Sequence, residues 1–393
     1  MKMPWSREGS REAAPTHHRA PREPLGARRL LVRGAVCLAT LALVDVVAIL
    51  AAGPQPHIDE SWRAPEALPS SAVPMALQTV REAAPGSAPV VAFVGASPTW
   101  GDGLADGEQT LPARWAQIAR ERGKESVVVN LAFNGQLVAD TGTLARAAAR
   151  DADVVFVQIT YRTFSPAARG GVTRRFPELP RLLGEPVLPT EAAATLTEPT
   201  PAFDVTGAAD RALRRIWRLY GMRDVLASRL LGAAPDERLH DQWEELTLGT
   251  WDEEPTTAGS FDDLAPDEQT LLAEEWAGDA EFELEPGDAE LAALEVLAAD
   301  LAARDATAVV FLAPLNVAAL ASYDYLDEAR LSRNVAAMRR AVERHGLRFV
   351  DLNDARAWRT ADFIDISHTT ASGTRAAAES LWAETSATVG GAP

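Results

Sequence analysis

The sequence predicts an α/β protein, with one doubly wound domain over residues 88–390 on a five-stranded parallel sheet. A transmembrane segment precedes this domain and a long acidic insertion interrupts it. Strand-like and helix-like segments alternate on both sides of the insertion. The strand-like runs are apolar throughout rather than alternating, as expected for strands covered on both faces. Apolar residues make up 47% of the chain, which is enough to build a sizeable core.

Five short apolar runs, rich in β-branched residues and bounded by turn residues, predict the strands: 88–94, 126–131, 153–159, 308–312 and 347–352. Segments with helical periodicity lie between and after them, and predict helices over 111–122, 144–150, 288–303, 327–345 and 370–385. Because parallel strands need crossover connections, these helices are expected to cover both faces of the sheet.

The N-terminal region predicts a membrane anchor. Residues 1–33 carry eight Lys and Arg against three Glu, and residues 34–53 are apolar with one charged residue, Asp45. The length of 34–53 suits a membrane-spanning helix, and the basic arm before it predicts that 1–33 is cytoplasmic. A cleaved signal peptide is the alternative, because Ala51-Ala52-Gly53 offers small residues to a signal peptidase. Both interpretations place the remainder of the chain outside the cytoplasm.

Two residues of the anchor bear on its partners. Asp45 is costly within a bilayer, so either it faces a polar transmembrane partner or a slight shift of the helix accommodates it. Cys37 is the single cysteine of the chain, which excludes an internal disulfide, and the residues before it do not form a lipobox. The net charge of −18 excludes a protein that binds nucleic acid through a broad basic face.

Two further regions flank or interrupt the domain. Residues 54–87 are rich in Pro, Ala and Ser and are interpreted as a linker that ends in a short helix. The insertion covers about 167–287, and the run 236–290 holds twenty Asp and Glu against one Arg, which is typical of a solvated surface. Its aromatic residues suggest a docking role. Residues 210–231 predict a basic amphipathic helix, which would lie either on an anionic membrane or against the domain.

The candidate site residues follow the predicted strands, since the active sites of open parallel sheets form at the carboxyl ends of the strands. Ser97 follows the first strand, Asn134 and Gly135 follow the second, and Tyr161 and Arg162 follow the third. Asp365 and His368 lie beyond the last strand. These positions converge at one edge of the sheet.

The residue types point to nucleophilic catalysis. A serine needs an imidazole to accept its proton and a carboxylate to orient that imidazole. Asp365 and His368 are three residues apart, so one loop can supply that pair. The other five histidines lie in the N-terminal arm, the linker, the acidic run or at a helix end. For Ser97 the alternative is a plain helix N-cap with no catalytic role.

These segments resemble the SGNH (GDSL-type) hydrolase family, whose fold is a flavodoxin-like α/β/α sandwich. The resemblance covers roughly residues 88–165 and 305–385. It rests on VVAFVGASPTWGDG around Ser97, VVNLAFNG ending at Gly135, and DISHTTASG with Asp365 and His368. It implies that Ser97 is the nucleophile, that His368 and Asp365 activate it, and that the amides of Ser97 and Gly135 contribute to an oxyanion hole.

Two positions depart from the family pattern. Ala96 stands where the family usually has Asp, which removes a side chain that supports the nucleophile loop. The third segment reads ITYRTF, without the asparagine that normally completes the oxyanion hole. Arg162 aligns best with that asparagine, and Tyr161 and Asn134 are the other candidates for the third donor.

The resemblance implies an O-acyl ester hydrolase or O-acyltransferase, acting on an envelope polysaccharide or another extracytoplasmic ester, with acetyl as the expected acyl group. One anchor followed by such a domain is similar to the accessory proteins of teichoic-acid D-alanylation and alginate acetylation. That likeness implies a multi-spanning membrane O-acyltransferase as partner. Neither a metal nor a cofactor is expected, because no cluster of His, Asp and Glu has ligand spacing apart from the single DISH turn at 365–368. The alternative is a non-catalytic module that binds a glycan or the membrane partner.

Overall fold

The computed structural model describes residues 58–64, 69–86, 88–170, 172–186 and 259–389, together with five single residues between 32 and 43. The chain divides into two units, Met1–Ala51 and Ala52–Pro393. Most of the predicted anchor, the predicted helix 210–231 and the first part of the acidic run lie outside the described residues. Within the part of the chain that is described, no helix has the length and apolar character needed to cross a membrane.

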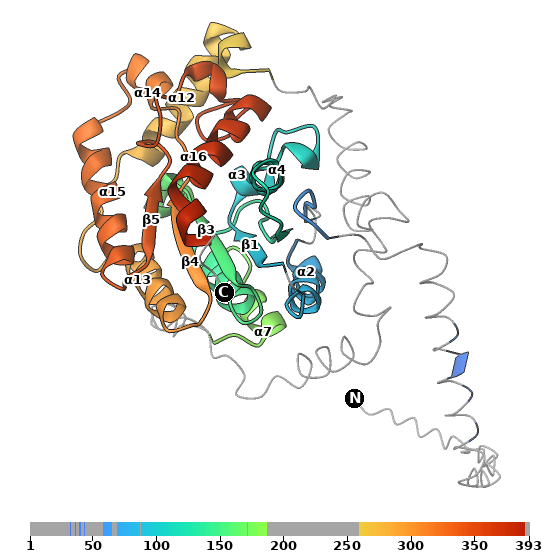
Figure 1. The fold of residues 1–393 in the computed structure, drawn as a ribbon. Coiled ribbons are helices and arrows are strands. Elements are labelled where there is room, and N and C mark those ends of the chain that lie inside the picture. The colour runs from blue at the N-terminus through green and yellow to red at the C-terminus, as the bar shows by residue number, and fades with distance from the viewer. Residues whose placement is uncertain are drawn as a thin grey trace, which may run out of the picture. The chain divides into compact units, whose positions relative to one another are not determined.

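The second unit is an α/β domain with a five-stranded sheet, shown in Figure 1. The predicted strands are confirmed as β1 (Val90–Val94), β2 (Val127–Asn130), β3 (Val154–Ile159), β4 (Thr307–Leu312) and β5 (Arg348–Asp351). All neighbouring strands are parallel and their order is β2-β1-β3-β4-β5. Because β1 lies between β2 and β3, the chain turns to opposite sides of β1 at this place, and a crevice forms at the strand ends there.

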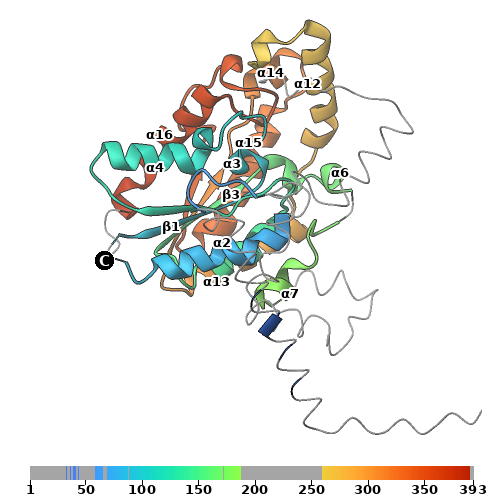
Figure 2. The ribbon, with the colours of Figure 1, turned by 90° about the vertical axis from the view of Figure 1, so that its right-hand side faces the viewer.

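Helices cover both faces of the sheet, which gives three layers (Figure 2). One face packs on α4 (Leu111–Glu121) and α16 (Ala371–Val389). The other face packs on four helices: α2 (Pro69–Ala83), α5 (Val138–Ala148), α13 (Ala289–Ala302) and α15 (Glu328–Glu343). Successive residues of a strand point to opposite faces of the sheet and so belong to two cores. Phe93 and Phe156 pack under α4 and α16, whereas Ala92 and Val155 pack on the opposite face.

Two helices differ from their predicted extent or setting. The helix predicted at 144–150 begins six residues earlier, at Val138, because the carboxylate of Asp140 accepts the amide of Leu137 and caps the first turn. The helix at the end of the linker, α2, belongs to the core, with Val73, Ala76 and Val80 fully buried.

Shorter helices complete the described structure: α3 (Ser97–Trp100), η1 (Gly107–Gln109), η2 (Tyr161–Phe164), α6 (Pro166–Arg169), α7 (Leu179–Leu183), η3 (Phe261–Asp263), α14 (Val317–Ser322) and η4 (Thr360–Asp362).

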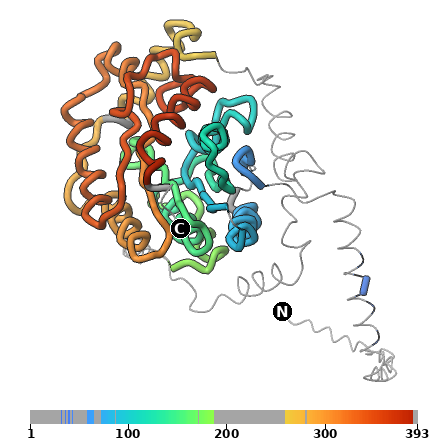
Figure 3. The backbone as a smooth tube through the Cα atoms, in the orientation of Figure 1, coloured from blue at the N-terminus to red at the C-terminus, as the bar shows by residue number. Residues whose placement is uncertain are grey.

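The last part of the acidic insertion is folded against the domain. It forms η3 and then α12 (Pro266–Ala280), which contacts α6, η2 and α14, and its path can be followed in Figure 3. The side chains of Phe261, Trp276 and Phe282 are buried, while most acids of α12 are exposed. The expectation of a solvated surface therefore holds for the exposed carboxylates of α12. The aromatic side chains of the run that the structure describes belong to the core instead.

The aromatic cluster beneath α4 and α16 gives a test of the fold. Phe156 is fully buried, stacks on Phe93 with ring centroids 4.6 Å apart, and meets Trp115 edge-on at 5.4 Å. Because Phe156→Ala leaves a large cavity, we expect it to lower the free energy of unfolding by about 3–5 kcal/mol in chemical denaturation of the full chain. The control is Leu271→Ala, at a position that is 64% exposed, with an expected change within about 0.5 kcal/mol. Equal effects of the two substitutions would contradict this packing.

Candidate active site

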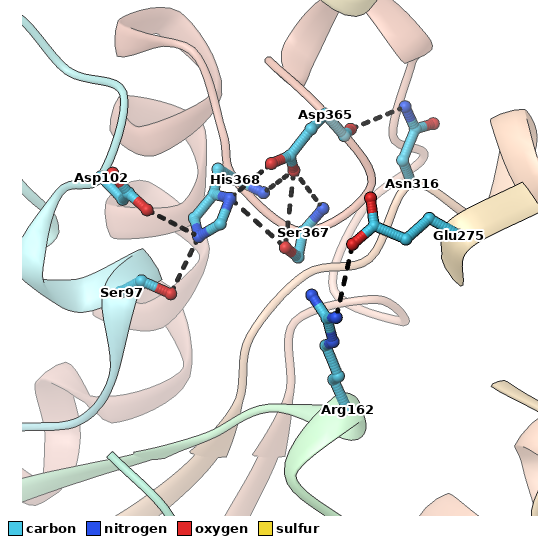
Figure 4. Close-up of polar contacts among 8 residues, drawn as sticks. All are labelled: Ser97, Asp102, Arg162, Glu275, Asn316, Asp365, Ser367 and His368. Carbon is cyan, nitrogen blue, oxygen red and sulfur yellow. Dashed lines mark hydrogen bonds and ion pairs between the residues drawn. The ribbon is translucent and has the colours of Figure 1, made fainter. Parts of the chain in front are cut away.

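The structure brings Ser97, His368 and Asp365 together at the carboxyl end of β1, as the sequence predicts (Figure 4). Ser97 Oγ lies 2.8 Å from His368 Nε2, although 271 positions separate the two residues in the chain. Ala96 takes the N-cap position of α3 and Ser97 is the first helical residue. The N-cap alternative for Ser97 is therefore wrong, and its hydroxyl faces the imidazole.

Asp365 fixes the orientation of the His368 ring. Its Oδ2 lies 2.6 Å from His368 Nδ1, and its Oδ1 accepts the backbone amides of Ser367 and His368 at 2.6 and 2.7 Å. With Asp365 ionised, Nδ1 donates to it and Nε2 is left to accept the proton of Ser97. The backbone amide of Ile364 donates to the His368 carbonyl and closes the turn. A spacing of three positions between the acid and the imidazole is thus enough to form the pair.

The charges around His368 favour the imidazolium form. Burial disfavours that form, but the hydrogen bond and the charge of Asp365 outweigh burial and raise the pKa of His368. Asp102 adds to this, with its Oδ2 3.6 Å from Nε2. Burial also opposes ionisation of Asp365, yet its contacts with His368 and Ser367 hold the pKa of that carboxyl below its ordinary value. The pair is therefore suited to stabilise a proton taken from Ser97.

Gln158 of β3 supports the nucleophile loop. Its Oε1 accepts the backbone amide of Ala96 at 2.8 Å, and its side chain is buried. A Cβ atom at Gly95 would overlap this Gln158 side chain, so only glycine allows the approach. The support that a side chain at position 96 was expected to give comes from Gln158 instead. Its one signal in the sequence is a polar residue within an otherwise apolar strand.

A pocket of about 360 Å³ opens beside Ser97 and contains most of the other predicted residues. Asn134, Gly135 and Arg162 all line it. Gly135 has φ +77°, a conformation that favours glycine. In the described part of the chain, the backbone amides of Ser97 and Gly135 donate to no other group. Both amides are therefore available to an oxygen atom in the pocket.

The two candidates that follow β3, Tyr161 and Arg162, lie in different surroundings. Tyr161 is buried and outside the pocket, because its hydroxyl accepts from Asn334 at 2.7 Å and its ring packs on Phe282. Arg162 lines the pocket, with its guanidinium 3.8 Å from Glu275 (Figure 4). The guanidinium also lies over the ring of Trp276. Thus α12, which belongs to the insertion, helps to place a pocket residue.

Some pocket residues were not anticipated from the sequence. Asp102, Arg169 and Arg175 line the pocket, and none follows a strand directly. Asp102 lies in the same segment as Ser97, and this proximity in sequence was the available signal. In the structure, the backbone amide of Asp102 donates to the Ser97 carbonyl at 3.1 Å. The two arginines lie in the insertion, where position relative to the strands carries no information.

No protein-family model matches the chain, and no curated protein matches its sequence.

The pKa of His368 provides a direct test of the site's electrostatics. We expect Asp102→Asn to lower this pKa, and Asp365→Asn to lower it further, because each removes a negative charge that favours the imidazolium. If the imidazole acts as a base, the acidic limb of activity moves to lower pH accordingly. The measurement is an NMR titration of the imidazole, assigned with a His368→Gln variant. Asp106→Asn, at an exposed position nearby, should leave the pKa in place, and an unchanged pKa in Asp102→Asn would show that solvent screens Asp102.

Proposed function

We propose that this chain is an SGNH-type serine hydrolase or O-acyltransferase. The observation that carries the proposal is the continuous hydrogen-bond chain from Asp365 through His368 to Ser97, located beside an open pocket. The strand order 2-1-3-4-5, with a nucleophile after β1, agrees with a flavodoxin-like sandwich and with a site at the β1/β3 switch point.

The residues suit a two-step acyl transfer. Ser97 Oγ attacks the ester carbonyl while His368 Nε2 takes its proton, which forms a tetrahedral oxyanion and an imidazolium paired with Asp365. The oxyanion collapses, the alcohol leaves with the proton from His368, and an acyl-serine remains. A second alcohol or water, deprotonated by His368, then attacks the acyl-serine and regenerates Ser97. Transfer and hydrolysis differ only in this acceptor.

Three donors are proposed for the oxyanion. The amides of Ser97 and Gly135 border the pocket and have no other acceptor in the described structure. Arg162 is the third, in preference to Asn134, because its guanidinium carries a permanent charge and α12 restrains it. Tyr161 is not proposed, since it binds Asn334 instead.

The setting of this chemistry follows from the N-terminal sequence. The basic arm, the apolar segment 34–53 and the likeness to envelope O-acylation proteins favour a single-pass membrane protein with an extracytoplasmic domain. An acylated envelope glycan is then the proposed substrate class, with acetyl as the acyl group. Asp45 would face a multi-spanning membrane O-acyltransferase as the partner.

The first experiment asks whether Ser97 is activated. We expect a fluorophosphonate or an activated acetyl ester to leave one covalent adduct on the full chain, detected by intact mass, and Ser97→Ala to abolish it. Turnover of the acetyl ester should fall by roughly 10⁶-fold. Ser372→Ala is the matched control, because Ser372 is exposed on α16 and should not affect labelling. Absence of an adduct on the parent chain would favour a module that binds a glycan or membrane partner.

A second experiment asks whether Arg162 is an oxyanion donor. We expect Arg162→Leu to lower the rate of acyl-enzyme formation from a neutral acetyl ester by about 10²–10³-fold, the usual cost of one lost donor. Labelling should still occur on Ser97, because the Asp365–His368 pair is untouched. An unchanged rate would assign the third position to Asn134 or to the two amides alone, and Asn134→Ala distinguishes these outcomes.

A further inference from the structure

The pocket beside Ser97 is basic, although the protein carries a net charge of −18. Three arginines line it, Arg162, Arg169 and Arg175, against one carboxylate, that of Asp102. Like-signed side chains in a confined pocket concentrate their field and attract ligands of the opposite charge. The local excess of positive charge is therefore a property of the pocket that the acyl-transfer chemistry alone does not require.

The three arginines differ in their ion pairs. Arg169 is mostly buried and pairs with the buried Glu290 at 3.1 Å, so much of its charge is compensated. Arg162 lies 3.8 Å from Glu275. In the described structure, Arg175 has no carboxylate within 4 Å of its guanidinium, and its side chain is exposed at the pocket. Arg175 is thus the residue best placed to pair with a ligand.

Arg175 lies beside the proposed oxyanion hole. Its Cγ and Nε are 3.8 and 3.9 Å from the position that a Cβ atom of Gly135 would occupy. A group that pairs with this guanidinium would therefore lie beside Gly135, in the pocket that Ser97 also lines.

The backbone at Arg175 is anchored by a buried carboxylate. Asp140 accepts the amides of Arg175 and Phe176 at 2.8 and 3.3 Å and pairs with Arg174 at 3.1 Å. Burial raises the pKa of Asp140 to about 6, so an ionised Asp140 is costly in this place. The same carboxylate caps α5 at Leu137, another pocket residue. Asp140 therefore fixes Arg175 relative to the turn that carries Gly135.

From these contacts we infer that the substrate is anionic, with a carboxylate or phosphate group that Arg175 binds next to the ester. The inference rests on the proposed acyl-transfer function and specifies its substrate class. Arginine suits this role because its planar guanidinium forms paired hydrogen bonds with either oxyanion. Arg162 serves the oxyanion, and Glu290 compensates much of the charge of Arg169, so Arg175 is the arginine assigned to the anionic group.

The test compares three acetyl esters of one sugar framework that differ in a single substituent: a neutral hexose, its uronic acid and its 6-phosphate. We expect the full chain to favour an anionic ester in kcat/KM, and added salt to reduce this preference. Arg175→Gln should lower kcat/KM for the favoured anionic ester by about 10- to 100-fold, the usual effect of a hydrogen bond to a charged group, and leave the neutral ester unchanged. The preferred ester identifies the oxyanion as carboxylate or phosphate.

Arg340→Gln is the matched control, because Arg340 is exposed on α15 and does not line the pocket. Binding of the three sugars to Ser97→Ala, measured by calorimetry, separates the inference from the function. Preferential binding of an anionic sugar that depends on Arg175 supports the inference even if no ester is turned over. Equal affinities or no binding in that variant, or equal kcat/KM values in the parent chain, would overturn it even if Ser97 forms an adduct.

Discussion

The parallel pairing of β1 with both β2 and β3 is the constraint on which the site depends. Val91 is in register with Val128 on one side and Val154 on the other, so the three strands end at the same edge. The loops that follow them carry Ser97, Gly135 and Arg162 to one pocket. Most strand residues are buried and apolar, and this burial fixes the sheet on which the polar edge is built.

Electrostatic compensation runs through the whole site. Burial disfavours the charged forms of both His368 and Asp365, and the contact between them offsets this desolvation cost. Two backbone amides also donate to Asp365. The buried carboxylate of Asp140 is compensated in the same way, by Arg174 and by backbone amides. In both cases, a carboxylate whose burial is costly orders a loop that lines the pocket.

The acidic insertion contributes to the site in spite of its composition. Its first described part contains Arg169 and Arg175. Its last part includes α12, which contacts Arg162 through Glu275 and Trp276. The insertion thus supplies arginines to the pocket wall while most acids of α12 face solvent. This separation gives a protein with a high negative charge a basic pocket, which connects the substrate class to the segment that most distinguishes this chain from a minimal α/β domain.

The sequence by itself determined the five strands, the long helices other than α12, and the association of Ser97, Asp365 and His368. Apolar periodicity marks the strands and helices, and in a parallel α/β sheet residues that follow different strands lie close together. It did not separate Arg162 from Tyr161, since adjacent residues on a 3₁₀ turn point in different directions and only the packing of Asn334 and Phe282 around Tyr161 decides which one is buried. Gln158, Asp102 and Arg175 depend on the tertiary structure for a related reason. Their roles arise from contacts across strands and between the insertion and the domain. These contacts join residues far apart in the sequence, so only the packed structure decides which side chains meet.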